Sequence, residues 1–285
     1  MSLHINKPQS ALLLGAGYVA RALAPRLVAQ GLTVDVTTRS GRTPLENVTC
    51  HKFNGEASAE LQGKFIAADI IVSSIPPNRD RTDPALLAFG HLTSAARWIA
   101  YLSATSVYGD RSGQWAYEGE APTPGLKRGQ ARADAELAWI ETIWPVHIFR
   151  LAGIYGPGRA PFDKLRQNKA RTILKDGHVV NRIHVDDIVD ALFLSLKSPN
   201  PQSIYNLADG HPAPPQEVLD YAAGLLKLPP PPRVALDDPS ISDMARSFYA
   251  ETKRISADKA RQELGWTPQH RSYRDGLESI LRKIS

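Results

Sequence analysis

The sequence predicts an α/β fold built on a doubly wound parallel sheet, with a smaller, mostly helical C-terminal lobe. Short apolar runs alternate with helical periods through the first third of the chain, and a glycine-rich turn joins the first run to the first helix. After Ala208 the composition shifts toward proline and helical spacing. Strands that alternate with helices form parallel sheets with right-handed crossovers, so these observations favour a sheet covered by helices on both faces.

The first third contains four predicted strands and two predicted helices. Each strand is a short apolar or alternating run rich in β-formers, and the first helix carries its apolar residues on one face. The strands are Ala11–Leu14, Thr33–Thr38, Ile70–Ser74 and Trp98–Ser103, and the helices are Tyr18–Ala29 and about Ala85–Arg97.

The middle of the chain is less regular. Tyr108–Gly125 is rich in glycine, proline and acidic residues, and loops this long inside a compact domain are usually functional. Asp186 is a suitable N-cap for a helix that follows. The remaining predicted elements are a helix over Gln130–Ile143, a strand over Val146–Leu151, a helix over Asp187–Leu196 and a strand over Ser203–Leu207. We expect a dinucleotide-binding domain over 1–160 and 181–207, and the smaller lobe over 161–180 and 208–285.

Composition predicts a soluble, cytoplasmic protein. Hydrophobic residues make up 42% and charged residues 22% of the 285 residues, and no apolar stretch is long enough to cross a bilayer. The first nine residues lack a basic start followed by an apolar block, so no secretory signal is expected. Cys50 is the single cysteine, which suits a reducing compartment.

A net charge of +5 favours anionic ligands. The basic residues are spread along the chain, so no nucleic-acid partner is expected, and neither is a membrane partner. The densest basic segment is either a solvated helix face or a rim that meets a phosphate or carboxylate substrate. Its residues are Lys164, Arg166, Lys169, Arg171 and Lys175.

The glycine-rich turn predicts a Rossmann-type nucleotide site. Gly15 makes the tight turn, Gly17 lets the backbone approach a pyrophosphate, and Ala20 allows the helix to lie close to the strand, with Tyr18 and Val19 between them. The free N–H groups of the helix N-terminus would face the phosphates. The alternative is a tight turn with no ligand.

The end of the second strand indicates the cofactor. A carboxylate there would hold a ribose hydroxyl, and an arginine would accommodate a 2′-phosphate. Asp35 lies within the strand, whereas Arg39 and Ser40 follow its carboxyl end. We therefore expect NADP(H) rather than NAD(H), which remains the alternative. At the next strand end, Ser73, Ser74 and Ile75 are expected to line the cofactor.

Five motifs resemble the extended short-chain dehydrogenase/reductases, in particular an atypical branch like the NAD(P)-dependent epimerases and dehydratases. The resemblance covers almost the whole chain and implies the same fold and cofactor class, and it allows a homodimer. The motifs are Gly15–Ala20, Leu102–Gly109, Arg150–Arg159, Arg182–Asp187 and Glu263–Pro268.

The catalytic Ser/Thr, Tyr and Lys implied by the resemblance are not preserved. In the family, the tyrosine exchanges a proton, the lysine lowers its pKa and holds the ribose, and the Ser/Thr orients the substrate. The matching positions here are Ala104, Arg128 and Arg132. Because arginine stays protonated, it cannot serve as an ordinary acid or base. Arg132 could still hold the cofactor.

Substitute catalytic residues can be proposed. Tyr117 could bring a phenol to the substrate, Thr105 offers a hydroxyl beside the vacant serine position, and His184 can change charge near neutral pH, although a hydrogen-bonded structural histidine is the alternative. We expect a small-molecule substrate near Tyr155, Arg159 and Arg182. No metal site is expected, since Cys50 and His51 lack further ligands.

Two functions from different classes follow. The first is an NADP(H)-dependent oxidoreductase or epimerase that acts on a small anionic or sugar-nucleotide-like substrate through a non-standard acid or base. The second is a catalytically inactive NAD(P)-binding redox sensor or regulatory scaffold.

Overall fold

The computed structural model describes residues 7–284, so residues 1–6, on which part of the expectation about a signal falls, lie outside the described residues. The chain divides into two compact units, neither of which is one continuous stretch. Unit 1 consists of the chain up to Ala104, Gln130–Arg150 and Leu192–Tyr205. Unit 2 consists of Thr105–Gly129, Leu151–Ala191 and the chain from Asn206 onward. The boundaries expected from the sequence stay a prediction.

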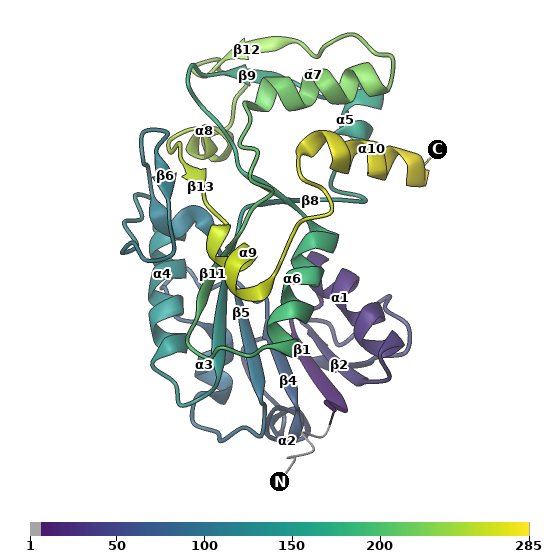
Figure 1. Ribbon diagram of the computed structural model, residues 1–285, viewed down its shortest axis with the longest axis vertical. Coiled ribbons are helices and arrows are strands. Elements are labelled where there is room, and N and C mark those ends of the chain that lie inside the picture. The colour runs from purple at the N-terminus through teal and green to yellow at the C-terminus, as the bar shows by residue number, and fades with distance from the viewer. Residues whose placement is uncertain (1–6, 285) are drawn as a thin grey trace. The chain divides into compact units, whose positions relative to one another are not determined.

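A seven-stranded sheet in the order β11-β7-β5-β4-β1-β2-β3 confirms the predicted fold class (Figure 1). The pairs β3–β2, β2–β1, β1–β4 and β4–β5 are parallel, as expected for strands joined by helical crossovers. The strands are β1 Ser10–Leu14, β2 Thr33–Thr38, β3 Thr49–Lys52, β4 Ile70–Ser73, β5 Trp98–Ala104, β7 Val146–Leu151 and β11 Ile204–Leu207.

Helices pack on both faces of this sheet because its strands are apolar on both sides. One face buries α2 (Ala59–Ala67), α3 (Pro84–Phe89) and α4 (Lys127–Ile140), through a core that includes Phe65, Phe89 and Trp139. On the other face, Leu23 and Leu27 of α1 (Tyr18–Ala29) and Leu192 of α6 (Val185–Lys197) lie against Ile70, Val72 and Trp98.

The helix expected over Ala85–Arg97 is wrong beyond Phe89. Asp83 caps α3 by accepting from the N–H groups of Ala85 and Leu86, and the helix ends at Phe89 with Gly90 as its C-cap. The next residues turn away to serve another helix: Ser94 Oγ donates to Phe65 O, and Ala95 N donates to Ile66 O, at the end of α2. Residues 94 and 95 therefore donate hydrogen bonds to free carbonyl groups at the end of α2 and do not continue α3 as a helix.

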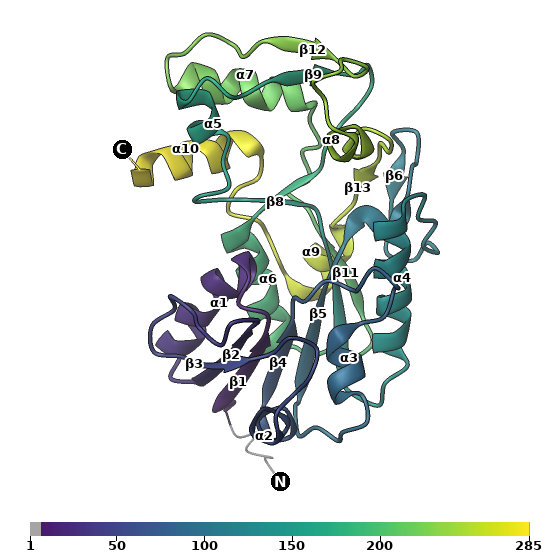
Figure 2. The same ribbon diagram turned by 180° about the vertical axis from the view of Figure 1, so that it is seen from behind.

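Unit 2 is built from short elements around its own apolar core. Phe162, Val218, Tyr273 and Leu277 are among the core residues, and α7 runs along β9 and β12 (Figure 2). Its helices are the 3₁₀ turn Thr105–Tyr108, α5 Phe162–Arg166, α7 Pro215–Leu225, α8 Asp243–Phe248, α9 Asp258–Leu264 and α10 Tyr273–Ile284. Its parallel strand pairs are β6 Trp115–Ala116 with β13 Arg254–Ile255, β8 Gly153–Tyr155 with β10 Arg182–His184, and β9 Thr172–Leu174 with β12 Arg233–Ala235.

No helix among residues 7–284 combines the length and the apolar character that a membrane span requires.

Candidate functional site

The turn between β1 and α1 leaves room for a ligand against the backbone. Gly15 has φ of +94°, and a Cβ added there would lie 2.9 Å from Ser74 Oγ. Its N–H donates to Thr37 Oγ1 at 2.8 Å. Gly17 is the N-cap of α1, and no side chain caps the helix or places an acid in its first turn. Uncapped N–H groups and a positive helix end fit the pyrophosphate of a dinucleotide.

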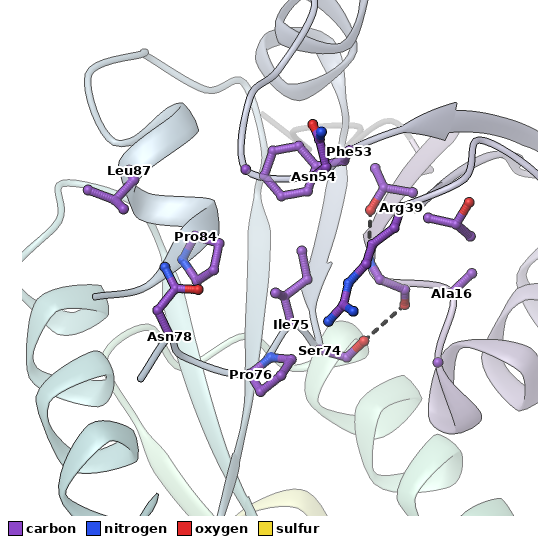
Figure 3. A pocket seen from close by; sticks show the side chains of 15 residues that line it. Ala16, Arg39, Phe53, Asn54, Ser74, Ile75, Pro76, Asn78, Pro84 and Leu87 are labelled. Atoms are coloured by element: carbon purple, nitrogen blue, oxygen red, sulfur yellow. Dashed lines mark hydrogen bonds between the residues drawn. The ribbon is translucent and has the colours of Figure 1, made fainter. Parts of the chain in front are cut away.

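A pocket of about 470 Å³ opens beside this turn (Figure 3). It contains five of the residues expected at the cofactor, namely Gly15, Gly17, Arg39, Ser74 and Ile75. The other six expected residues, Tyr18, Val19, Ala20, Ser40, Ser73 and Arg132, are not among its lining residues. Ala20 and Ser73 are buried in the fold. The role of each residue toward a cofactor stays a prediction.

Asp35 and Arg39 occupy opposite environments. Asp35 is buried and accepts a hydrogen bond from His51 Nε2 at 2.6 Å, while Lys64 Nζ lies 3.3 Å from its second oxygen. Its carboxylate is thus satisfied within the protein. Arg39 is exposed, and its side chain extends into the pocket toward Ile75 and Ser74 (Figure 3). No carboxylate lines the pocket among the described residues, so this wall suits a phosphate better than a ribose hydroxyl pair.

Sequence reasoning missed one wall of the pocket. Phe53, Asn54 and Gly55 follow β3, a strand that carries no strong alternation, and Asn78 and Leu87 also line the pocket. Phe53 N donates to Thr38 O at 2.8 Å, which places this segment beside the end of β2. The sequence gives only a weak strand signal for β3, and the pairing of β3 with β2 is long-range, so these residues could not be predicted from local pattern.

Arg132, at the family's lysine position, is engaged inside unit 1. Its Nη1 donates to Tyr101 Oη at 3.2 Å and to Leu102 O at 2.9 Å. Burial raises the pKa of the Tyr101 hydroxyl, with Arg132 opposing that shift. Tyr101 therefore remains a neutral phenol that can accept this bond.

Arg128, at the family's tyrosine position, is engaged inside unit 2. Its Nη1 donates to Ser247 Oγ at 2.7 Å and its Nη2 to Ser247 O at 3.0 Å. The guanidinium also lies 4.6 Å from the ring centroid of Phe248. This arginine therefore connects α8 to the first turn of α4.

The three residues proposed for chemistry lie in unit 2 but in different surroundings. Tyr117 is 47% exposed in the segment after β6, and Thr105 begins the 3₁₀ turn. His184 is fully buried. The structure shows no hydrogen bond that joins these three side chains among the described residues, and their catalytic roles stay predictions.

His184 caps α6, which corrects the expectation that Asp186 does so. The helix begins at Val185, and Asp186 N donates to His184 Nδ1 at 3.2 Å. Burial, and then the neighbouring His270, lower the pKa of His184 to about 4. The histidine is therefore neutral at pH 7, with its proton on Nε2. These contacts favour the structural alternative for His184.

Asp187 and His270 complete a buried group whose potential ligand atoms lie within 4.8 Å of those of His184. Asp187 already accepts from Gln269 N at 2.6 Å, His270 N at 3.2 Å and His270 Nδ1 at 2.9 Å. Because the neutral His184 carries its proton on Nε2, that nitrogen has no lone pair for a metal. The cluster fits a hydrogen-bonded anchor for the segment after Trp266.

A second cavity, of about 920 Å³, lies within unit 2. It brings together all three residues expected at the substrate, Tyr155, Arg159 and Arg182. Lys164, Lys169 and Arg171 from the densest basic segment also line it. The helix α5 ends at Arg166, so the segment is not one helix face, and three of its five cations border a cavity instead.

No family model matches the chain. The chain is 30% identical over 242 residues to protein YeeZ of Escherichia coli K12, across 77% of this chain and 84% of that protein. A conserved protein of unknown function from Silicibacter pomeroyi has a solved structure with 39% identity and a TM-score of 0.89, covering 96% of this chain and 99% of that one. UDP-glucuronic acid 4-epimerase from Bacillus cereus, solved with UDP-glucuronic acid and NAD, is 16% identical, with a TM-score of 0.76 over 97% of this chain and 100% of that one.

Proposed function

Because the chain belongs to the YeeZ-like proteins, which have the fold of the NAD(P)-dependent epimerases and dehydratases, we propose that it binds NADP(H) and acts on a small anionic substrate as an oxidoreductase or epimerase. The bound dinucleotide would supply hydride chemistry. The chain itself would bind and orient the two ligands and provide a non-standard acid or base.

The observation that carries this proposal is the pocket beside the β1–α1 turn. It combines an uncapped helix N-terminus, a glycine at which a side chain would collide, and one arginine at the end of β2. The solved epimerase holds NAD, whereas here Arg39 faces the pocket and Asp35 is occupied by His51 and Lys64. This difference supports NADP(H) over NAD(H).

Unit 2 supplies the groups proposed for the substrate. Tyr155, Arg159 and Arg182 share one cavity, and cationic groups suit an anion. For proton transfer we propose Tyr117 or Thr105, since both have exposed surface, while the burial of His184 argues for a supporting role.

A second candidate, an inactive NAD(P)-binding sensor or scaffold, is favoured by one specific observation. The positions of the family's tyrosine and lysine are occupied by Arg128 and Arg132. Both arginines donate hydrogen bonds to other residues of the protein. Proteins that have lost turnover can retain such positions for stability alone. Turnover distinguishes the two candidates: oxidation of NADPH by a panel of carbonyl compounds, lost in Tyr117→Phe, would establish the enzyme.

Calorimetric titration with NADPH and NADH tests the cofactor. An arginine–phosphate contact contributes about 1.5–3 kcal/mol, so NADPH should bind roughly 10- to 100-fold tighter than NADH. Arg39→Ala should lower NADPH affinity to the NADH value. Arg79→Ala is the matched control, because this exposed arginine adjoins the pocket residue Asn78 without lining the pocket. No binding of either cofactor would refute the proposal.

A further inference from the structure

The charges that line the cavity in unit 2 indicate which class of ligand it could bind. Five of its lining residues are cations, and no aspartate or glutamate lines it among the described residues. The cations are Arg159, Lys164, Lys169, Arg171 and Arg182. Two carboxylates outside the lining interact with this charge, Asp209 with Arg182 and Asp238 with Arg171. The cations outnumber these two carboxylates, so the cavity favours a ligand with more than one negative charge.

The rest of the lining is mostly apolar. Ile154, Val218, Leu219, Ile241 and Leu277 contribute hydrocarbon surface. A cavity of about 920 Å³ has room for a ligand well beyond an inorganic anion. The occupant should therefore carry an apolar body that leaves water on binding.

Hydroxyl-recognising groups are scarce in this cavity. It has no asparagine or glutamine in its described lining, and its side-chain oxygens are hydroxyls of two serines and two tyrosines. Ser240 Oγ donates to Asp238 Oδ1 at 2.6 Å, and Ser242 Oγ accepts from Ala245 N at 3.2 Å. Tyr155 Oη donates to Ser272 O at 3.3 Å. Few side-chain groups therefore remain that could accept a hydrogen bond from a sugar hydroxyl, which weakens sugar binding.

Tyr273 is the exception. Its side chain is 1% exposed and lines the cavity, and its hydroxyl has no hydrogen-bond partner among the described residues. A buried hydroxyl without a partner is costly, so a ligand atom at this point would satisfy it. Arg182 lines the same cavity, and both of its hydrogen bonds, to Val180 O and Ala213 O, come from Nη1. Its Nε and Nη2 make no hydrogen bond within residues 7–284 and can donate to an anion, which would compete with the nearby Asp209 carboxyl group for the Arg182 charge.

We propose that this cavity binds an amphipathic phosphate ester, a mono- or diphosphate joined to an apolar body with few hydroxyls, rather than a sugar nucleotide. The inference rests on the proposed function in that it names the substrate class of the same protein. The phosphates would lie against the cations and the Tyr273 hydroxyl. The apolar body would lie against Val218, Leu219 and Leu277.

Calorimetric titration of the full chain with four probes tests the proposal: geranyl diphosphate, pyrophosphate, geraniol and UDP-glucose. Geranyl diphosphate should bind at least about tenfold tighter than pyrophosphate or geraniol, because only it offers both charge and apolar surface. UDP-glucose should bind no tighter than pyrophosphate. A tighter UDP-glucose complex, or no binding of geranyl diphosphate, would overturn the proposal.

Variants locate the binding. Lys169→Gln combined with Arg171→Gln should lower geranyl diphosphate affinity roughly 3- to 10-fold, whereas Arg166→Gln, on the same segment but outside the lining, should not. Tyr273→Phe should lower affinity roughly 2- to 10-fold. Tyr221→Phe is its control, because the Tyr221 hydroxyl bonds Glu278 and does not line the cavity. Unchanged affinity in the double variant and in Tyr273→Phe would refute the site.

NADPH titration of the same samples separates the two proposals. NADPH binding without geranyl diphosphate binding refutes the ligand class and leaves the cofactor proposal standing. Geranyl diphosphate binding without NADPH binding refutes the cofactor proposal and leaves the ligand class standing.

Discussion

Arg150 binds the Glu136 carboxylate through two of its guanidinium nitrogens inside unit 1. Its Nη2 lies 2.7 Å from Glu136 Oε2 and its Nε 3.1 Å from both carboxylate oxygens, while each residue is only 2% exposed. Ser103 Oγ donates to the same carboxylate at 2.5 Å. The buried pair thus joins β5, α4 and β7 just below the strand ends.

Glu136→Gln should lower the free energy of unfolding by about 3–5 kcal/mol. The substitution leaves the Arg150 charge buried without its counter-ion, which is more costly than the pair itself is stabilising. Urea unfolding followed by circular dichroism measures the change. Glu141→Gln, an exposed glutamate just past the end of α4, is the control and should change stability by less than about 0.5 kcal/mol. Equal stability of the two variants would contradict a structural role for the pair.

Gly15→Ala should abolish NADPH binding and destabilise the protein by about 1–3 kcal/mol. The new Cβ would meet Ser74 Oγ at 2.9 Å, and φ of +94° is strained for alanine. Gly63→Ala is the matched control, since Gly63 lies inside α2 with no atom within 4 Å of an added Cβ. That change should stabilise the protein by about 0.5–1 kcal/mol. Calorimetry and thermal unfolding report both effects, and NADPH binding by Gly15→Ala would contradict the assigned turn.

Stability should fall as the pH drops from 6.5 toward 4. His147 is buried, its Nδ1 lies 3.3 Å from Ile99 O, and its Nε2 accepts from Asn200 N at 3.0 Å. Burial lowers its pKa from 6.5 to about 4. The unfolded chain therefore takes up the proton first, so the contribution of His147 is complete above pH 6.5 and declines below it, by about 3 kcal/mol in all.

His147→Gln isolates this group, since His178 and His184 also have pKa values lowered by burial to about 4. The variant should reduce the slope of unfolding free energy against pH, between pH 6 and 5, by about 1.2 kcal/mol per pH unit. Exposed His91→Gln should leave the slope as it is. Identical slopes in the wild type and His147→Gln would show that this histidine does not titrate in the expected range.

Arg128→Ala should loosen α8. The substitution removes two hydrogen bonds to Ser247 and the contact with Phe248, and α8 buries no side chain of its own. Hydrogen exchange over residues 243–249 should accelerate roughly 10-fold or more. Lys127→Ala provides a neighbouring exposed control. Unchanged exchange would mean that α8 is held by other contacts.

The regular part of the fold followed from sequence pattern, and the exceptions have physical causes. Ala11–Leu14 and Tyr18–Ala29 show strong apolar periods, and their predicted ranges match β1 and α1 closely. The prediction of a helix beyond Phe89 was wrong because residues 94 and 95 donate hydrogen bonds to α2. Local spacing in the sequence does not indicate such a long-range contact. The sequence did not predict strand β3, which has few apolar residues, or helix α2, which is short and contains Gly63 although Ser58 caps it at Leu61 N.

The candidate site was predictable where one motif formed it. Gly15, Gly17 and Arg39 are close in sequence and share the pocket. Phe53 lines it from the segment after β3 and Leu87 from α3, and no local pattern marks a residue that meets the site only after folding. The buried pairing of Asp35 with His51 could likewise not be predicted from the sequence, because it depends on the register of β2 with β3.

The division of the chain into interleaved units also restricts how such a protein can change. The backbone passes from one unit to the other at residues 104–105, 129–130, 150–151, 191–192 and 205–206. No single cut releases either unit as a linear fragment, so one fusion or truncation point cannot exchange unit 1 for that of a relative. An exchange of unit 1 would need new junctions at all five of these crossings at once.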